Sequence, residues 1–228
     1  MATVLVVAAH PDDEILGCGG TIARHAARGD NVSLLFLADG ETSRPGAGTA
    51  DIEKRQAAAR KAAEIVGASI FDFADFPDNR LDGVELLTVV RRIEAAIGEL
   101  APEIVYTHAL ADLNIDHQTC HRATLTACRP LPGRSVRRLL AFETLSSTEW
   151  SAEAMAVRFC PTLFIDIGDH LAQKLEALDC YDDELPPFPH ARSREAVEAL
   201  ARRRGAEVGC PAAEAFQIIR EIEGRTGR

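Results

Sequence analysis

Short apolar runs alternate with amphipathic stretches along this chain, and that alternation restricts the fold more than any other feature. The run Val4–Val7 precedes a helical pattern, and the same order recurs with short connections. The pattern predicts strands over residues 3–9, 31–38, 69–74, 103–107, 138–142 and 163–167, and helices over residues 15–28, 51–66, 85–100 and 117–129. We therefore expect an α/β fold, with a Rossmann-like, doubly wound, mostly parallel sheet and helices on both faces.

The last third of the chain reads as mostly helical, with helical stretches near Leu171, Glu195 and Phe216. No internal repeat or low-complexity segment divides the sequence. Its 228 residues, 46% of them hydrophobic, are enough for one full core. We expect a single domain over residues 1–228 whose carboxyl-terminal third caps the site.

Charge restricts the partners. A formal net charge of −10 argues against nucleic acid or an anionic membrane, because both favour a basic face. No segment approaches the roughly 20 apolar residues of a membrane span, and the chain opens on a strand rather than on a signal peptide. We expect a cytoplasmic protein with a small-molecule partner, and a homo-oligomer stays open.

The six cysteines form no C-x-x-C pair, which predicts buried thiols.

Ionisable residues cluster where the first strand ends, and this is where α/β folds place their sites. His10 and Asp13 offer a nitrogen and an oxygen ligand to a metal such as zinc, while Asp12 between them must point elsewhere. His117, which follows the strand at residues 103–107, is the candidate third ligand. Two histidines and one carboxylate leave a coordination position open for water, which is typical of catalytic zinc and indicates hydrolysis.

A glycine cluster after the same strand raises the alternative of a dinucleotide site. Gly17, Gly19 and Gly20 do not fit the G-x-G-x-x-G spacing, because Ile22 occupies the third glycine position. The acidic cluster would also repel a pyrophosphate. The glycines instead indicate close approach of the first helix to the sheet.

Residues 8–14 contain the sequence Ala-His-Pro-Asp-Asp-Glu, and here the chain resembles the PIG-L/LmbE-like family of metal-dependent N-deacetylases. The similarity runs over nearly the whole chain, through Asp39–Glu41, the helix at residues 55–67 and the segment Ala213–Phe216. The resemblance implies a Rossmann-like fold and removal of acetyl from an amino sugar. It also implies a zinc site formed by His10, Asp13 and His117. Asp12 would be the general base.

The second family motif differs in this chain. Many members read His-Pro-Asp-His, whereas residues 114–117 read Asn-Ile-Asp-His. The family histidine is thought to steady or protonate the tetrahedral intermediate. Asn114 can donate a hydrogen bond to an oxyanion but cannot deliver a proton to the leaving amine. We expect Asp12 to act as base and then as acid, with His108 or His190 as an assistant.

Substrate contacts are predicted from loops around the site. Arg55 matches an arginine that the family uses toward the sugar, and a solvated helix charge is the alternative. Glu41 is likewise a candidate substrate contact, with an exposed surface charge as the alternative. Asp78 and Asn79 follow a strand, and their side chains can hydrogen-bond sugar hydroxyls. The segment Pro189–Ser193 interrupts the helical third and suits a lid.

Three functional classes stay open. The first is a zinc-dependent deacetylase of an N-acetylated amino sugar in a glycoconjugate, sugar nucleotide or antibiotic-type glycoside. The second is a metal-dependent amidohydrolase of a different conjugate amide, and the third is a non-catalytic sugar-binding or regulatory module. Zinc is the expected cofactor, and Fe²⁺ or Co²⁺ would accept the same ligands.

Overall fold

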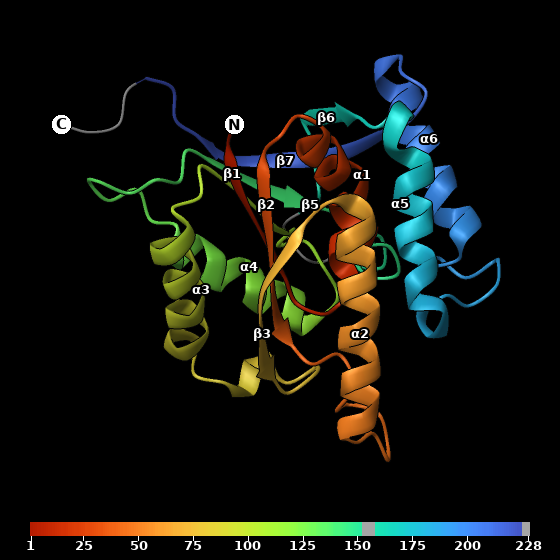
Figure 1. Cartoon of the computed structure of the whole chain (residues 1–228), viewed down its shortest axis with the longest axis horizontal. Coiled ribbons are helices and arrows are strands. Elements are labelled where there is room, and N and C mark those ends of the chain that lie inside the picture. The colour runs from red at the N-terminus through yellow and green to blue at the C-terminus, as the bar shows by residue number, and fades with distance from the viewer. Residues whose placement is uncertain (152–157, 225–228) are drawn as a thin grey trace.

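The computed structural model describes residues 1–151 and 158–224, which fold around one seven-stranded sheet (Figure 1). The strands are β1 (Thr3–Ala8), β2 (Asn31–Ala38), β3 (Ser69–Phe76), β4 (Ile104–His108), β5 (Arg138–Phe142), β6 (Leu163–Asp166) and β7 (Ala213–Glu221). The α-helices are α1 (Asp13–Ala27), α2 (Thr49–Val66), α3 (Leu86–Leu100), α4 (Ile115–Ala127), α5 (Leu171–Leu178) and α6 (Arg194–Val208). Short 3₁₀ helices are η1 (Leu81–Gly83), η2 (Gly168–His170) and η3 (Asp179–Glu184).

The strand order is β3-β2-β1-β4-β5-β7-β6. Strands β1 to β5 run parallel, whereas β7 is antiparallel to β5 and β6 is antiparallel to β7. The expected Rossmann-like, doubly wound and mostly parallel sheet is confirmed. After β3 the chain returns to place β4 on the free side of β1, so β1 and β4 flank a topological switch point. Open α/β sheets bind ligands in the crevice at such a point.

Helices cover both faces of the sheet. In Figure 1, α2, α5 and α6 lie on one side of the sheet, and α3 and α4 lie on the other. Alternate residues of β1 separate the two cores, since Val4 and Val6 pack with residues of α1, α2 and α5, and Leu5 and Val7 pack with residues of α3 and α4. Because β1 is buried on both faces, its residues are apolar throughout.

The helix expected near Phe216 is wrong, because this segment is strand β7, inserted between β5 and β6. Phe216 is fully buried, and its ring lies 5.2 Å from that of Tyr106 in an edge-to-face contact. The run Ala213–Phe216 contains residues that favour a helix, but pairing with two neighbouring strands decides its conformation. The stretches at Leu171 and Glu195 are helical as predicted, in α5 and α6.

Close approach of the first helix to its neighbours is confirmed at two glycines. A Cβ atom on Gly17 would lie 2.2 Å from the Phe142 ring, and one on Gly20 would lie 2.7 Å from Ile167. Both distances are too short for real atoms, so only glycine allows α1 to pack this closely. The packing of α1 against Phe142 of β5 and against Ile167 therefore depends on these positions.

The cysteines are all free, and buried thiols were predicted for them. Cys18, Cys120 and Cys128 are buried, whereas Cys160 is exposed and Cys180 and Cys210 are partly exposed, so the prediction holds for half of them. Over residues 1–151 and 158–224, no helix has the length and apolar composition needed to cross a bilayer.

Candidate active site

The turn from β1 into α1 presents the first ionisable cluster. Asp12 has φ 129° and ψ −31°, a conformation that a residue with a side chain rarely adopts. Its backbone N–H donates to Glu14 Oε2 at 2.9 Å, and the Tyr181 hydroxyl donates to Glu14 Oε1 at 2.6 Å. The buried Glu14 thus ties the strained turn to η3, and the turn directs Asp12 away from its neighbour Asp13.

His10, Asp13 and His117 converge below this turn, all of them buried. Asp13 Oδ2 lies 3.1 Å from His10 Nδ1 and 3.3 Å from His117 Nε2. His117 Nε2 and Asp13 Oδ1 have no hydrogen-bond partner among the described residues. A buried polar atom without a partner is costly, and two such atoms within one cluster of possible ligands fit a bound cation. The donor set, with two nitrogens and one carboxylate, suits zinc.

Asp112 orients His117 from behind. Asp112 Oδ1 lies 3.1 Å from His117 Nδ1 and accepts the Asn114 N–H at 2.9 Å. The Ser147 hydroxyl also donates to Oδ1, and the Thr148 hydroxyl donates to Oδ2 at 2.8 Å. Burial alone would raise the pKa of Asp112, but the neighbouring His117 lowers it below its usual value. The resulting carboxylate holds the proton of His117 on Nδ1 and leaves Nε2 free for a metal.

Two carboxylates perform the same task for His10. Its Nε2 lies 3.1 Å from both Asp116 Oδ2 and Asp78 Oδ1. Asp116 is itself held by the backbone N–H groups of Asn79 at 2.7 Å and Leu81 at 2.9 Å. Although burial opposes ionisation of Asp78, the hydrogen bond from His10 brings its pKa down to about 2. The Nδ1 atom of His10 therefore faces Asp13 and the candidate metal position.

Asp12 lies between two arginines. Its Oδ2 is 3.1 Å from Arg192 Nη1 and 3.5 Å from Arg55 Nη2, while its Oδ1 has no hydrogen-bond partner among the described residues. Arg192 is fixed in turn, because its Nε donates to Ser146 Oγ at 2.6 Å. Burial raises the pKa of Asp12, and the two guanidinium charges oppose that shift. A buried carboxylate with one free oxygen and a raised pKa is suited to accept and return a proton.

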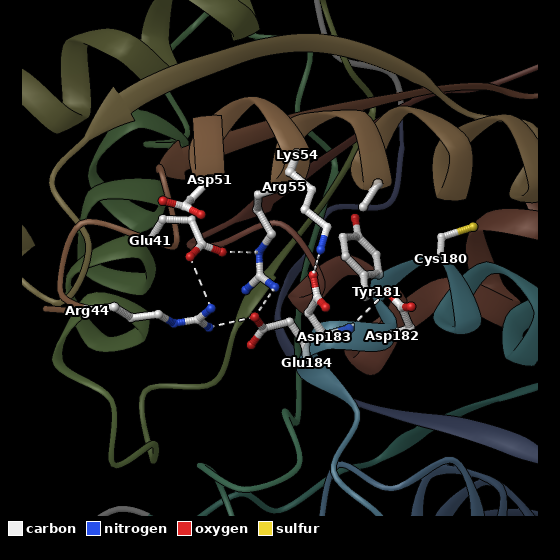
Figure 2. A pocket seen from close by; sticks show the side chains of 11 residues that line it. Glu41, Arg44, Asp51, Lys54, Arg55, Cys180, Tyr181, Asp182, Asp183 and Glu184 are labelled. Carbon is white, nitrogen blue, oxygen red and sulfur yellow. Dashed lines mark hydrogen bonds and ion pairs between the residues drawn. The ribbon is translucent and has the colours of Figure 1, made fainter. Parts of the chain in front are cut away.

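His10, Asp12 and the two arginines border a polar pocket of about 130 Å³, which we call the site pocket, whereas Asp13 and His117 are not in its lining as the described residues form it. It is lined by His10, Asp12, Gly40, Ser43, Arg44, Arg55, Asp78, Asn79, Asn114, Glu184 and Arg192. The predicted residues Arg55, Asp78 and Asn79 thus lie beside the predicted base. Glu41 lines a neighbouring pocket instead (Figure 2), 3.8 Å from the Nε of Arg55.

Asn114 begins helix α4 as its amino-terminal cap. Its Oδ1 accepts the Asp116 N–H at 2.8 Å, and its Nδ2 donates to Asn79 Oδ1 at 3.2 Å. Asparagine is among the preferred residues at this position of a helix. The side chain therefore offers only its amide N–H groups to the site pocket.

The two histidines expected as assistants lie elsewhere. His108 is fully buried, its Nε2 accepts the Ala9 N–H at 2.9 Å, and its Nδ1 lies 3.2 Å from Thr144 Oγ1. Burial and the charge of His117 bring the pKa of His108 down to about 3, so it is neutral. His190 accepts the Arg192 N–H on its Nδ1 at 3.1 Å. Neither lines the site pocket as it is formed by residues 1–151 and 158–224.

Several residues of this arrangement were not singled out from the sequence. Asp112 and Asp116 precede His117 in the same segment. Carboxylates so close in sequence to a predicted ligand could have been predicted to lie near the metal site. Arg192 stands in the segment Pro189–Ser193, which was expected to act as a lid. Glu184 had no signal in the sequence, because only the packing of η3 against α2 brings it to Arg55, at 2.8 Å.

The fold and the site define an α/β protein with a buried histidine–carboxylate centre at the switch point of its sheet. The sequence model of the PIG-L family, described as GlcNAc-PI de-N-acetylase, matches residues 5–128. The chain therefore belongs to the PIG-L family of deacetylases, and the resemblance noted from its motifs is confirmed.

Two curated relatives named as deacetylases and one solved structure of a hydratase are similar to this chain. "Uncharacterized deacetylase YaiS" of Escherichia coli K12 is 31% identical over 181 residues, which cover 77% of this chain and 88% of that protein. A "1D-myo-inositol 2-acetamido-2-deoxy-alpha-D-glucopyranoside deacetylase" of Saccharomonospora viridis is 29% identical and covers 88% of this chain and 80% of its own length. The crystal structure of GalB, the 4-carboxy-2-hydroxymuconate hydratase of Pseudomonas putida KT2440, superposes with a TM-score of 0.78 at 25% identity, covering 100% of both chains.

Proposed function

We propose that this protein is a metal-dependent hydrolase that removes the acetyl group from an N-acetylated amino sugar. The observation that carries the proposal is the position of Asp12, which lines the site pocket, has one carboxylate oxygen without a partner among the described residues and lies next to the buried set of His10, Asp13 and His117. The names of two relatives, a deacetylase and a deacetylase of a 2-acetamido sugar, support the same activity.

His10 Nδ1, Asp13 and His117 Nε2 would hold the metal. When bound there, zinc supplies a Lewis acid that polarises a carbonyl and lowers the pKa of water to about 7. Asp112, Asp116 and Asp78 keep both histidines oriented and hold their second ring protons. The closeness of these three possible ligands supports the proposed metal site.

Asp12 carries the proton through the reaction. Its carboxylate takes a proton from water as the water oxygen forms a bond to the acetyl carbon and the C=O π bond opens. Asn114 donates an amide N–H to the developing oxyanion. Asp12 then returns the proton to the nitrogen as the C–N bond breaks, giving acetic acid and a free amine, between which the remaining proton passes to form acetate and an ammonium ion. Arg192 and Arg55 hold the carboxylate in place between the two transfers.

Acetate release from a panel of N-acetylated amino sugars, their nucleotides and their glycosides tests the proposal. Asp12→Asn should keep its zinc, measured by elemental analysis, and lose roughly 10²- to 10⁴-fold in turnover, the usual contribution of general acid–base catalysis. Asp82→Asn is the matched control, because Asp82 is exposed. Full activity in Asp12→Asn would remove this residue from the mechanism. A larger acid in place of acetate would identify a different amide, and bound metal without any hydrolysis would indicate a sugar-binding module.

A second candidate is a hydratase that adds water to an unsaturated carboxylate. Two observations favour it: the full-length superposition on GalB, and the guanidinium groups of Arg44, Arg55 and Arg192 in the site pocket, which suit a carboxylate ligand. Asp12 would serve the same function of taking a proton from water. Loss of ultraviolet absorbance on incubation with a conjugated unsaturated dicarboxylate, with no acetate from the sugar panel, would support this reading over the first.

A further inference from the structure

A pocket of about 300 Å³ lies between the last turns of helix α1 and strand β6, and we call it the α1–β6 pocket. Arg24 Nη1 on α1 donates to the backbone oxygen of Asp166 on β6 at 2.6 Å, which holds the two elements together (Figure 1). Helix α1 begins at Asp13, a candidate metal ligand, and its 15 residues extend over roughly 20 Å. No described residue lines both this pocket and the site pocket, so the two are separate.

The polar part of the lining carries a surplus of positive charge. It contains Arg24, Arg28 and Arg138, whereas Asp166 is its only carboxylate among the described residues. That carboxylate accepts the Gly168 N–H at 2.9 Å, and Arg24 binds the backbone oxygen instead. In a chain with a net charge of −10, three guanidinium groups around one small pocket indicate an anionic ligand.

Two of these arginines are available to a ligand. Arg28 is exposed, and its guanidinium forms no hydrogen bond or ion pair with the described residues. Arg24 has its one hydrogen bond to a backbone oxygen, so its charge is not neutralised. Arg138 differs, because its Nε lies 3.0 Å from Glu221 Oε1. Basic residues are common in the last turn of a helix, so Arg24 and Arg28 alone would not indicate a site.

A buried hydroxyl in the same lining supplies an independent observation. Thr21 is 1% exposed, lines the pocket, and its Oγ1 has no hydrogen-bond partner among the described residues. Threonines in helices can donate to the carbonyl oxygen four residues earlier, as Thr119 does to Ile115 and Thr126 does to Arg122, both at 2.9 Å. Thr21 does not, and a buried hydroxyl without a partner is costly. A ligand oxygen would supply that partner.

The rest of the lining is largely apolar. Its apolar side chains are those of Tyr106, Leu163, Phe164 and Ile165. His25 also lines the pocket, but its Nε2 lies 2.9 Å from the Tyr106 hydroxyl and its Nδ1 lies 2.7 Å from Asp30 Oδ2, so both its nitrogens have partners. An inorganic anion would leave the apolar wall uncovered, whereas an anion with a hydrocarbon body would bury it.

We propose that the α1–β6 pocket binds a small organic anion. Its carboxylate or phosphate group contacts Arg24, Arg28 and Thr21, and its apolar body packs on β6. Either anionic group suits these residues, because each presents two oxygens that match the fork of a guanidinium. The pocket is separate from the candidate active site, so the proposal does not depend on the proposed deacetylase activity.

Calorimetric titration of the purified protein tests the ligand class with four probes. Phenyl phosphate and phenylacetate carry the two anionic groups on the same ring, and the tighter of the two identifies the preferred group. At least one of them should bind with a Kd in the millimolar range or tighter. Inorganic phosphate and benzyl alcohol should bind at least tenfold more weakly, because each offers only one half of the proposed ligand.

Two variants place the binding in this pocket. Arg28→Ala should weaken binding of the tighter probe at least fivefold, because it removes a cation that has no other partner. Arg91→Ala is the matched control, since Arg91 is an exposed arginine on α3 and lies outside this lining. Thr21→Val keeps the shape of the side chain and should weaken binding at least threefold. Its melting temperature should stay equal or rise, because the hydroxyl has no partner to lose.

Arg44→Ala separates this pocket from the candidate active site, because Arg44 lines the site pocket. It should leave the affinity unchanged. Weaker binding in Arg44→Ala than in Arg28→Ala would place the anion in the site pocket and overturn the proposal. Equal losses in Arg28→Ala and Arg91→Ala, no binding of either aromatic anion, or inorganic phosphate binding as tightly as phenyl phosphate would also overturn it.

Discussion

Replacing Asp112 with asparagine isolates the role of the carboxylate that holds His117. The groups that contact Asp112 are all donors: His117 Nδ1, the Asn114 N–H and the hydroxyls of Ser147 and Thr148. Asparagine has the same size, but it replaces one acceptor oxygen with a donor NH₂ group and removes the charge. The Thr148 hydroxyl can accept from that NH₂ group, so the four contacts can be kept, but the hydrogen bond to His117 is no longer charge-assisted.

The expected result is weaker metal binding without loss of the ligands. Removing a carboxylate behind a ligating histidine typically weakens metal affinity by about 10- to 100-fold, or roughly 1.4–2.7 kcal/mol. Zinc affinity measured by competition with a chromophoric chelator gives this quantity directly. Circular dichroism on the same samples shows whether the variant is folded.

Asp39→Asn provides a matched control for Asp112→Asn. Asp39 is buried and accepts from the backbone N–H groups of Glu41 and Thr42 and from the Thr42 hydroxyl, so it also has several donors around it. It belongs to none of the candidate ligand groups formed by the described residues. A zinc affinity of Asp112→Asn within twofold of the wild type would refute the proposed orientation of His117.

Three further changes test other parts of the structure. His117→Ala should lose stoichiometric zinc in elemental analysis, because it removes an unpartnered buried nitrogen from the ligand set; full metal content would exclude His117 as a ligand. Gly17→Ala should lower the free energy of unfolding in urea by about 1–3 kcal/mol, since its Cβ would overlap Phe142, whereas Gly98→Ala, with open space around it, should be neutral or stabilising. Arg192→Ala should reduce kcat at least tenfold at unchanged zinc affinity, because it frees Asp12 Oδ2 but touches no ligand; equal loss of zinc would contradict this assignment.

The site residues that the sequence predicts best are those held together by one short turn of the chain. His10, Asp12 and Asp13 lie within four residues of each other, so the end of β1 places them together whatever the rest of the fold does. Arg192 reaches Asp12 across 180 residues, and no local pattern records that contact. His108 looked like a candidate because it ends a strand, but its partners Ala9 and Thr144 come from neighbouring elements and use both its nitrogens.

The same distinction explains the error at Phe216. Strands that are buried on both faces, such as β1 and β2, can be recognised from their continuous apolar sequence. All five parallel strands were predicted within a few residues of their observed bounds. Strand β7 is different because it lies antiparallel between β5 and β6. Its Glu214 is buried and pairs with Lys174 at 2.6 Å. This partner comes from α5, so the ion pair that allows a charged residue inside the sheet forms only when the chain is folded. This half of β7 therefore shows no alternation of buried and exposed residues, because Glu214 is buried together with Ala213, Ala215 and Phe216.

The replacement of the family histidine by Asn114 has a consequence for how protons are handled. Because Asn114 Oδ1 is committed to the cap of α4, the amide can contribute only N–H groups, and these stabilise negative charge without transferring a proton. His108 is neutral and enclosed, so it cannot replace the missing group. In the proposed mechanism, the proton that Asp12 takes from water is then the one that reaches the leaving nitrogen. On this reasoning an Asn114→Ser variant, which can still cap α4 but has no amide N–H, should lower the rate only by the loss of one hydrogen-bond donor, whereas any change that removes the carboxylate of Asp12 stops both transfers.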